Sequence, residues 1–323
     1  MFEVGIDNYG LYPLELSPLQ TLEWAGRNGA AGVQFSGLTP PHDRPLEKAE
    51  LCDLADFAAG SGLYLEWGGG QHIPFDTVVW TEKDIFPVNR RAAEEARTLG
   101  CRIVRSCSGG QMRWRPESPA TKFLLRQTAR ALLEQRSMLR DNNVLLAVET
   151  HFEFTTFELL RLFDMCEAEP GDWLGLCLDT MNLLVLLEDP VKAVDRVLPW
   201  VVSTHIKDGG LLFDGEGLTA FPVELGRGVV DIRSILSKLA RLKEVPHLSV
   251  EDHGGSFVMP IDDPVFLSEF PDLTPEELTE LIRTARASET SGLPSPVERV
   301  RWPEVCESRL QADLEALKAM ASE

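Results

Sequence analysis

The feature that most constrains this chain is the repeated alternation of a short apolar run with a longer amphipathic segment. A strand, a crossover helix and a second strand form a parallel unit, so alternation of this kind favours a parallel sheet. The runs with the composition of buried strands lie at 3–8, 33–35, 63–67, 102–105, 144–148, 173–178, 200–206 and 248–250. Eight such runs separated by helices predict an α/β fold, a (β/α)8 TIM barrel, over residues 1–255.

The remaining residues, 256–323, predict extra C-terminal helices near 274–288 and 304–321. Leu310, Leu314 and Leu317 recur at helical spacing, so we expect this extension to pack on the barrel or on a partner subunit. Within the barrel, a single long helix is expected over 120–140. The stretch 209–224 is rich in glycine and predicts a lid loop with exposed aromatic side chains.

Four of the predicted strands run out onto residues that can bind metal. Glu149, Asp179, His205 and Glu251 lie at the ends of the fifth to eighth apolar runs. Because the carboxyl ends of parallel strands meet at one rim, we expect these four side chains to share one divalent ion. Three carboxylates and one imidazole suit Mn²⁺, Mg²⁺ or Zn²⁺. Each residue taken alone could equally be a helix cap or a buried hydrogen-bonding group.

Composition excludes several classes of protein. With 44% hydrophobic residues the chain can bury a large core, yet no apolar run approaches the ~20 residues of a membrane span. The first residues lack the features of a signal peptide, and the six cysteines are scattered, so we expect a cytoplasmic protein with reduced thiols. The net charge of −20 argues against nucleic-acid binding and favours a small sugar or polyol as partner.

The motifs at the strand ends resemble those of the xylose-isomerase-like superfamily of sugar isomerases and epimerases. The resemblance rests on Glu149, Leu-Asp179-Thr, Thr-His205-Ile-Lys207-Asp208, Gly226-Arg-Gly228 with Asp231, and Val-Glu251, and it covers roughly residues 1–255. It implies that the four ligands hold one divalent ion, Mn²⁺ first, with Mg²⁺, Co²⁺ or Zn²⁺ as alternatives. It also implies that the two glutamates act as acid/base groups. The chain departs from the ketose 3-epimerases at Asn182, where they usually have histidine, and at Met181, where glycine is common.

Further residues near the strand ends are candidates for the site. His151, two residues after Glu149, is a candidate acid/base, although a surface histidine is the ordinary alternative. The candidates for substrate binding are Lys207, Asp208, Trp67, His72, Arg105 and Asn182. Four of these candidates have a structural alternative to substrate binding. Lys207 and Asp208 could form a salt bridge with each other, Trp67 could belong to the core, and Arg105 could form a structural ion pair.

The function expected from these residues is a metal-dependent isomerase or epimerase of a sugar, keto-sugar or polyol. A bound divalent ion would stabilise the enediolate formed when Glu149 or Glu251 removes a proton beside a carbonyl. The nearest alternative is a lyase or dehydratase that eliminates a group from a 3-keto-glycoside or an inosose. A non-catalytic barrel whose C-terminal helices serve assembly, as a homo-oligomer or with a small partner subunit, is the second alternative.

Overall fold

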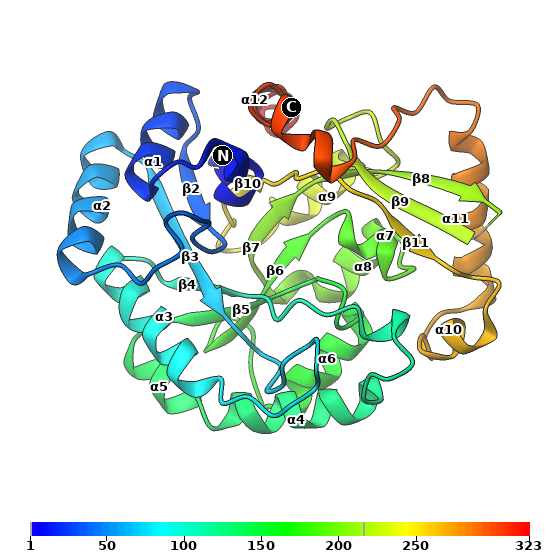
Figure 1. Cartoon of the computed structure of the whole chain (residues 1–323), viewed down its shortest axis with the longest axis horizontal. Coiled ribbons are helices and arrows are strands. Elements are labelled where there is room, and N and C mark those ends of the chain that lie inside the picture. The colour runs from blue at the N-terminus through cyan, green and yellow to red at the C-terminus, as the bar shows by residue number, and fades with distance from the viewer. Residues whose placement is uncertain (1, 216) are drawn as a thin grey trace.

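The structure is a computed structural model that describes residues 2–215 and 217–323. Within these ranges eight parallel strands close into a barrel in the order β1-β10-β7-β6-β5-β4-β3-β2 (Figure 1). The predicted (β/α)8 barrel is confirmed, and each apolar run supplies one strand. The barrel strands are β1 (Val4–Asp7), β2 (Gly32–Phe35), β3 (Tyr64–Gly70), β4 (Ile103–Ser106), β5 (Leu145–Glu149), β6 (Leu174–Asp179), β7 (Val201–Ile206) and β10 (Leu248–Val250).

Helices cover the outside of the barrel. In the described part of the chain, none of them is both long and apolar enough to cross a bilayer. The α-helices are α1 (Pro18–Arg27), α2 (Lys48–Ser61), α3 (Phe86–Leu99), α4 (Thr121–Leu133), α5 (Arg136–Asp141), α6 (Thr156–Met165), α7 (Asn182–Val185), α8 (Pro190–Val197), α9 (Ile232–Leu239), α10 (Pro264–Ser268), α11 (Pro275–Ser288) and α12 (Trp302–Ala321). The 3-10 helices are η1 (Asn8–Leu14) and three single turns, η2 (Met112–Trp114), η3 (Leu198–Trp200) and η4 (Arg299–Arg301).

The expected single helix over 120–140 is instead two helices, α4 and α5. The chain turns between them at Gln135, whose side chain is buried. Gln135 Nε2 donates to the carbonyl oxygen of Ala131 at 2.9 Å, and its Oε1 accepts a hydrogen bond from Asn89 of α3 at 2.6 Å. This polar tie to a neighbouring helix is a tertiary contact, which the apolar stripe of the segment does not reveal.

The stretch predicted as a lid loop is a β-hairpin. Strands β8 (Asp208–Asp214) and β9 (Gly217–Val223) pair antiparallel, and β11 (Phe257–Met259) adds to β9 to make a small separate sheet. The sheet lies beside the barrel with α11 packed on β8 (Figure 1). Phe221 is fully buried and Phe213 is half-buried, so the expectation of exposed aromatic side chains is wrong.

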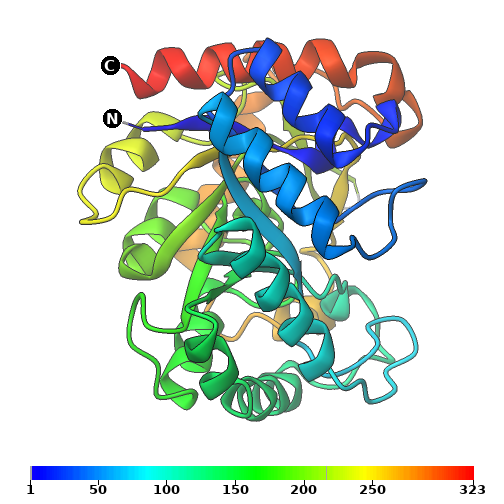
Figure 2. The same cartoon turned by 90° about the vertical axis from the view of Figure 1, so that its left-hand side faces the viewer.

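The C-terminal helix packs on the barrel, and its predicted inward face is confirmed. Leu310, Leu314 and Leu317 are buried, and α12 lies against η1, β1 and β10 (Figures 1 and 2). Trp302, at the start of α12, is fully buried and donates from Nε1 to the carbonyl oxygen of Gly10 at 2.9 Å. A domain boundary at residue 255 stays a prediction, since β11 lies beyond it and pairs with β9.

A buried arginine ties α12 to the loop after β10. Arg309 Nη2 lies 3.0 Å from Asp252, Nε lies 3.3 Å from Asp313, and Nη1 lies 3.5 Å from Glu224. Asp313 also accepts a hydrogen bond from the backbone N–H of Leu225 at 2.8 Å. The network therefore joins the tail to the residue next to Glu251.

Stability is expected to fall as pH rises toward neutrality, because of Asp313. Burial raises the pKa of Asp313 from 3.8 to about 7, although Arg309 opposes the shift; Asp252 and Glu224 also face it. The folded chain therefore holds this proton more tightly than the unfolded chain between those pH values. The contribution of this proton to the free energy of unfolding is complete below about pH 4 and is lost by about pH 7. Asp313→Asn is expected to flatten this decline by on the order of 2 kcal/mol.

Urea unfolding at about pH 5 and about pH 8 measures this difference. Asp313→Asn keeps an oxygen for the Leu225 N–H, and Asp56→Asn, an exposed change on α2, is the matched control. If the free energy of unfolding of Asp313→Asn depended on pH as it does in the original chain, Asp313 would not be the group responsible.

Candidate metal centre and active-site cavity

The carboxyl ends of β5, β6 and β7 bring three predicted metal ligands together. Glu149 ends β5, Asp179 ends β6, and His205 lies one residue before the end of β7. The register of β6 and β7 sets Asp179 directly beside His205. One ligand atom from each of the three residues lies within 4.8 Å of the other two, and all three side chains are buried.

Glu149, Asp179 and His205 are each held in place by neighbouring residues. In each case one atom that could bind a metal ion faces the other two residues. Asp179 Oδ1 accepts hydrogen bonds from the backbone N–H groups of Met181 and Asn182 at 3.0 and 2.9 Å. Glu149 Oε2 is bound by Arg105, and Glu149 Oε1 lies 3.2 Å from His205 Nδ1. Such fixed carboxylates are typical of the surroundings of a metal ion.

The imidazole of His205 is oriented from behind. Its Nε2 contacts Gln34 Oε1 and lies 3.4 Å from Asp7 Oδ2, while Nδ1 faces the carboxylates. Metal-binding histidines usually donate their second ring N–H to an oxygen in this way. Asp7 and Gln34 were not identified from the sequence.

Glu251 lies beside this group and is joined to it through Lys207. Glu251 Oε2 is 3.8 Å from His205 Nδ1 and forms an ion pair with Lys207 Nζ, which is also 3.0 Å from Asp179 Oδ2. Burial disfavours the charged ammonium, but Asp179 and Glu251 outweigh this and raise the pKa of Lys207. Likewise, burial opposes ionisation of Glu149, yet Arg105 and His205 hold its pKa well below the ordinary value.

The donor set fits a divalent cation. Asp179 Oδ2 and Glu251 Oε2 are buried, accept no hydrogen bond of good geometry from the described residues, and face the Lys207 ammonium instead. Buried anionic oxygens of this kind require a positive charge nearby. With Glu149 and the imidazole of His205 they form an oxygen-rich set that suits Mn²⁺ or Mg²⁺.

A cavity of about 330 Å³ opens above these residues. Six of the residues singled out in the sequence line it: Arg105, Glu149, His151, Asn182, Lys207 and Glu251. Sequence reasoning missed others, among them Tyr9, Ser36, Thr39, Cys107, His253 and Arg299. All of these except Arg299 lie within four residues after the end of a barrel strand, which is the signal that would have found them.

His151 is held in a fixed orientation at the cavity wall. Its Nδ1 lies 2.8 Å from Glu153 Oε2, and Glu153 Oε1 accepts a hydrogen bond from the backbone N–H of Gly109 at 2.5 Å. Cys107 completes a cluster in which one ligand atom per residue lies within 4.8 Å of the other two. A histidine oriented by a carboxylate can donate or accept a proton at its other nitrogen.

Three predicted substrate-binding residues do not line this cavity. Trp67 points out of the barrel, where Nε1 donates to Glu95 of α3 at 2.9 Å. His72 is buried with Nδ1 3.0 Å from Ser106 Oγ, and burial lowers its pKa to about 4. Asp208 accepts backbone N–H groups from Gly209, Gly226, Gly228 and Val230, so it anchors the segment after β9 rather than pairing with Lys207.

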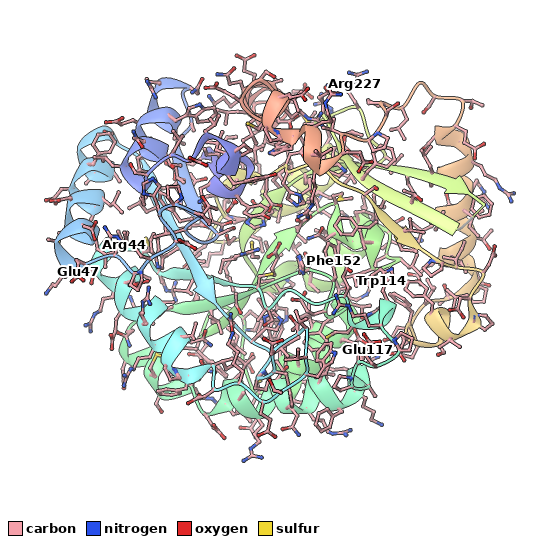
Figure 3. All side chains as sticks on the ribbon, viewed as in Figure 1. Arg44, Glu47, Trp114, Glu117, Phe152 and Arg227 are labelled. Carbon is pink, nitrogen blue, oxygen red and sulfur yellow. The ribbon has the colours of Figure 1, made fainter. Side chains whose placement is uncertain are left out.

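The cavity continues into a second hollow of about 540 Å³. The two share Gly109, His151, Phe152 and Arg299 in their walls. Phe152 packs against Phe257 of the small sheet with ring centroids 4.5 Å apart and the rings tilted, and Trp114 lies close by (Figure 3). Trp114 Nε1 donates to the carbonyl oxygen of Val258 at 2.7 Å, which ties this aromatic wall to β11. We call this second space the outer hollow.

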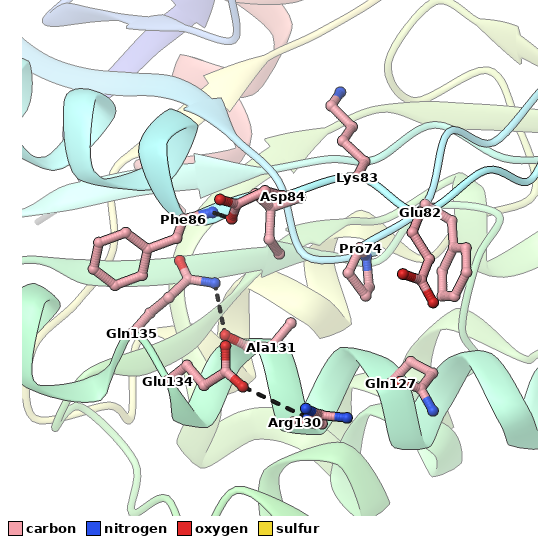
Figure 4. Close-up of a pocket in the computed structure, with 12 residues that line it drawn as sticks. Pro74, Glu82, Lys83, Asp84, Phe86, Gln127, Arg130, Ala131, Glu134 and Gln135 are labelled. Atoms are coloured by element: carbon pink, nitrogen blue, oxygen red, sulfur yellow. Dashed lines mark hydrogen bonds and ion pairs between the residues drawn. The ribbon is translucent and has the colours of Figure 1, made fainter.

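A separate hollow of about 460 Å³ lies between α4 and the loop before α3 (Figure 4). Its polar side chains bond locally: Arg130 lies 3.6 Å from Glu134, and Asp84 accepts the backbone N–H of Phe86 at 3.0 Å. None of the residues lining it is a candidate for the metal centre.

A closed (β/α)8 barrel with carboxylates and an imidazole at the carboxyl ends of its strands defines a class of barrel with a candidate metal centre. Comparison with known proteins gives the family. The chain belongs to the xylose isomerase-like TIM barrel family, whose profile matches residues 22–284.

Relatives within and around this family differ in their reactions. Over 238 residues the chain is 25% identical to the 3-oxo-isoapionate decarboxylase of Pectobacterium atrosepticum, covering 71% of this chain and 77% of that protein. A D-allulose 3-epimerase from Methylomonas sp. superposes with a TM-score of 0.62 at 15% identity over 99% of each chain. A xylose isomerase-like protein from Mycobacterium smegmatis, in complex with magnesium, gives 0.61 at 16% identity over 88% of this chain and 98% of that one. These two structural likenesses support the fold alone.

Proposed function

We propose that this chain is a divalent-metal-dependent isomerase or epimerase that acts on a sugar, keto-sugar or inositol-like polyol through an enediolate. The observation that carries the proposal is the convergence of Glu149, Asp179 and His205, with Glu251 beside them, under a cavity of about 330 Å³. Membership of the xylose isomerase-like TIM barrel family supports the choice of substrate class.

The chain's own residues supply the proton transfers. Glu149, Asp179, His205 and Glu251 would hold the ion, which supplies Lewis acidity that acidifies a C–H bond beside a carbonyl. Glu149 and Glu251 come from different strands, so one can remove that proton and the other can return one at another position or face. Lys207, between Asp179 and Glu251, provides a cationic donor for a substrate oxygen.

A lyase on the same scaffold is the second candidate, because the relative from Pectobacterium is a decarboxylase. Loss of CO₂ from a 3-keto acid leaves an enolate, and an enediolate where the carbon that loses CO₂ bears a hydroxyl group, so the same groups would serve both reactions. His151, oriented by Glu153, is positioned to deliver the proton that replaces the departing group, or to assist elimination of water or an aglycone.

Turnover in D₂O separates these reactions. The Mn²⁺-loaded chain is incubated with ketoses, inososes, 3-keto-glycosides and 3-keto sugar acids, and products are analysed by NMR and mass spectrometry. We expect deuterium beside the carbonyl, with an epimer or isomer formed and no group lost. Release of CO₂, water or an aglycone would instead establish a lyase. Absence of both exchange and product across the panel would contradict enediolate chemistry.

A further inference from the structure

The outer hollow contains two arginines that form no ion pair with the described residues: Arg115, which is half-buried, and Arg299, which is exposed. Buried arginines elsewhere are matched with carboxylates, for example Arg113 with Glu158 and Arg309 with Asp252. Arg115 and Arg299 are more accessible, both line the outer hollow, and neither guanidinium forms a hydrogen bond or ion pair within the part of the chain that the structure describes. The chain has 51 acidic and 31 basic residues, and the notable feature is that two arginines without a carboxylate partner line the same hollow.

Arg299 is held against the backbone between the two spaces. Gly255 has a φ of +93°. A Cβ atom added there would lie 3.0 Å from Arg299 Nε, because the Arg299 side chain packs directly over this glycine. The backbone N–H of Gly255 donates to the carbonyl oxygen of Val297 at 2.8 Å, which fixes the segment that precedes Arg299. A side chain larger than hydrogen at residue 255 would displace the arginine from this position.

The charges around both spaces favour an anion. Glu298 is the single carboxylate among the described residues of the outer hollow, against Arg115 and Arg299. In the inner cavity, Glu149 and Glu251 are already matched by Arg105 and Lys207. The wall therefore carries positive charge that the protein leaves unmatched, although the whole chain has a net charge of −20.

We propose that the outer hollow is a subsite for the anionic end of the substrate, a carboxylate or phosphate bound by Arg299 and Arg115. The inference rests on the proposed function for the location of the reacting end, which lies in the inner cavity. Guanidinium groups bind carboxylates and phosphates through charge-assisted, often bidentate hydrogen bonds. The substrate is then a sugar acid or sugar phosphate, which departs from the neutral sugar that the acidic composition favours.

Binding can be measured without turnover, so this test is independent of the proposed reaction. Calorimetry on the purified full-length chain compares glucose with two charged probes of the same skeleton, glucuronate and glucose 6-phosphate. We expect at least one charged probe to bind about tenfold more tightly than glucose, and the preferred probe distinguishes carboxylate from phosphate. Arg299→Ala and Arg115→Ala are each expected to remove most of this preference, whereas Arg299→Lys keeps part of it.

Arg126→Ala is the matched control, since Arg126 is exposed on α4 and remote in sequence from the hollow's walls. The control is expected to retain the preference of the original chain. Equal affinity for glucose and both charged probes, no binding of either charged probe up to about 10 mM, or a preference that survives both alanine substitutions would overturn the subsite. A preserved anion preference in a chain that turns over no keto sugar would instead refute only the proposed reaction.

Discussion

Replacing Glu251 by glutamine is expected to lower turnover by about 10²–10⁴-fold while the chain stays folded. Glutamine has nearly the same shape, but its amide neither accepts the substrate proton nor provides an anionic oxygen. Lys207 keeps its contact with Asp179 at 3.0 Å, so the substitution does not leave this buried ammonium without a partner. The same loss is expected for Glu149→Gln. Steady-state kinetics with the substrate identified in D₂O, alongside circular dichroism, measure both effects.

Glu244→Gln is the control, because Glu244 is an exposed carboxylate outside the cavity wall. Turnover in this variant is expected to match the original chain. If either Glu149→Gln or Glu251→Gln retained near-normal turnover, its carboxylate would not be the base, and His151 with Glu153 would take its place as the first candidate.

Removal of the divalent ion is expected to abolish turnover and to lower the thermal midpoint. An ion that binds only the folded chain adds about 2.7 kcal/mol to stability when its free concentration is 100 times its dissociation constant. We therefore expect one ion per chain after reconstitution with Mn²⁺, and a drop of several degrees in the midpoint on chelation. Asp179→Asn is expected to weaken ion binding strongly, because Asp179 Oδ2 is one of the buried oxygens without a hydrogen bond.

Asp164→Asn, an exposed change on α6, alters net charge equally and is expected to leave metal content unchanged. Elemental analysis and differential scanning calorimetry supply readouts that do not depend on activity. Substoichiometric metal after reconstitution, together with a midpoint that chelation does not move, would contradict the metal centre and favour a non-catalytic barrel.

The barrel could be predicted from the sequence because each of its strand and helix units is encoded by a contiguous stretch of residues. Each apolar run and the helix after it are contiguous, and right-handed parallel connection then puts all strand ends on one rim. For this reason Glu149, Asp179 and His205 could be brought together from their positions alone, and the structure sets their ligand atoms within 4.8 Å.

Side-chain direction was harder to predict than strand position. Trp67 follows Glu66 on β3, and alternate residues of a strand face opposite sides. Glu66 points into the barrel, where its Oε2 accepts a hydrogen bond from Gln34 at 2.6 Å, so Trp67 must point outward to α3. Applying this alternation to each strand would have removed Trp67 from the substrate-binding set.

Contacts between distant segments could not be predicted. The hairpin had a local signal, the Asp214-Gly215 pair between apolar runs, which is a common turn sequence. No local pattern, however, indicates that Lys207 sits between Asp179 and Glu251, or that Arg299 reaches a cavity formed by the barrel strands. These placements depend on how the tail and the strand ends pack together.

The anchoring of the tail bears on how the wall of the outer hollow could be altered by protein engineering. Arg299 lies beyond residue 284, where the match to the family profile ends, while Trp302 and Arg309 fasten the same segment to Gly10 and Asp252. The stretch between α11 and Trp302, which carries Arg299, could therefore be replaced while Trp302 and Arg309 keep the C-terminal helix packed on the barrel. Under the proposed anion subsite, such replacements would alter substrate preference and would leave the barrel strands unchanged.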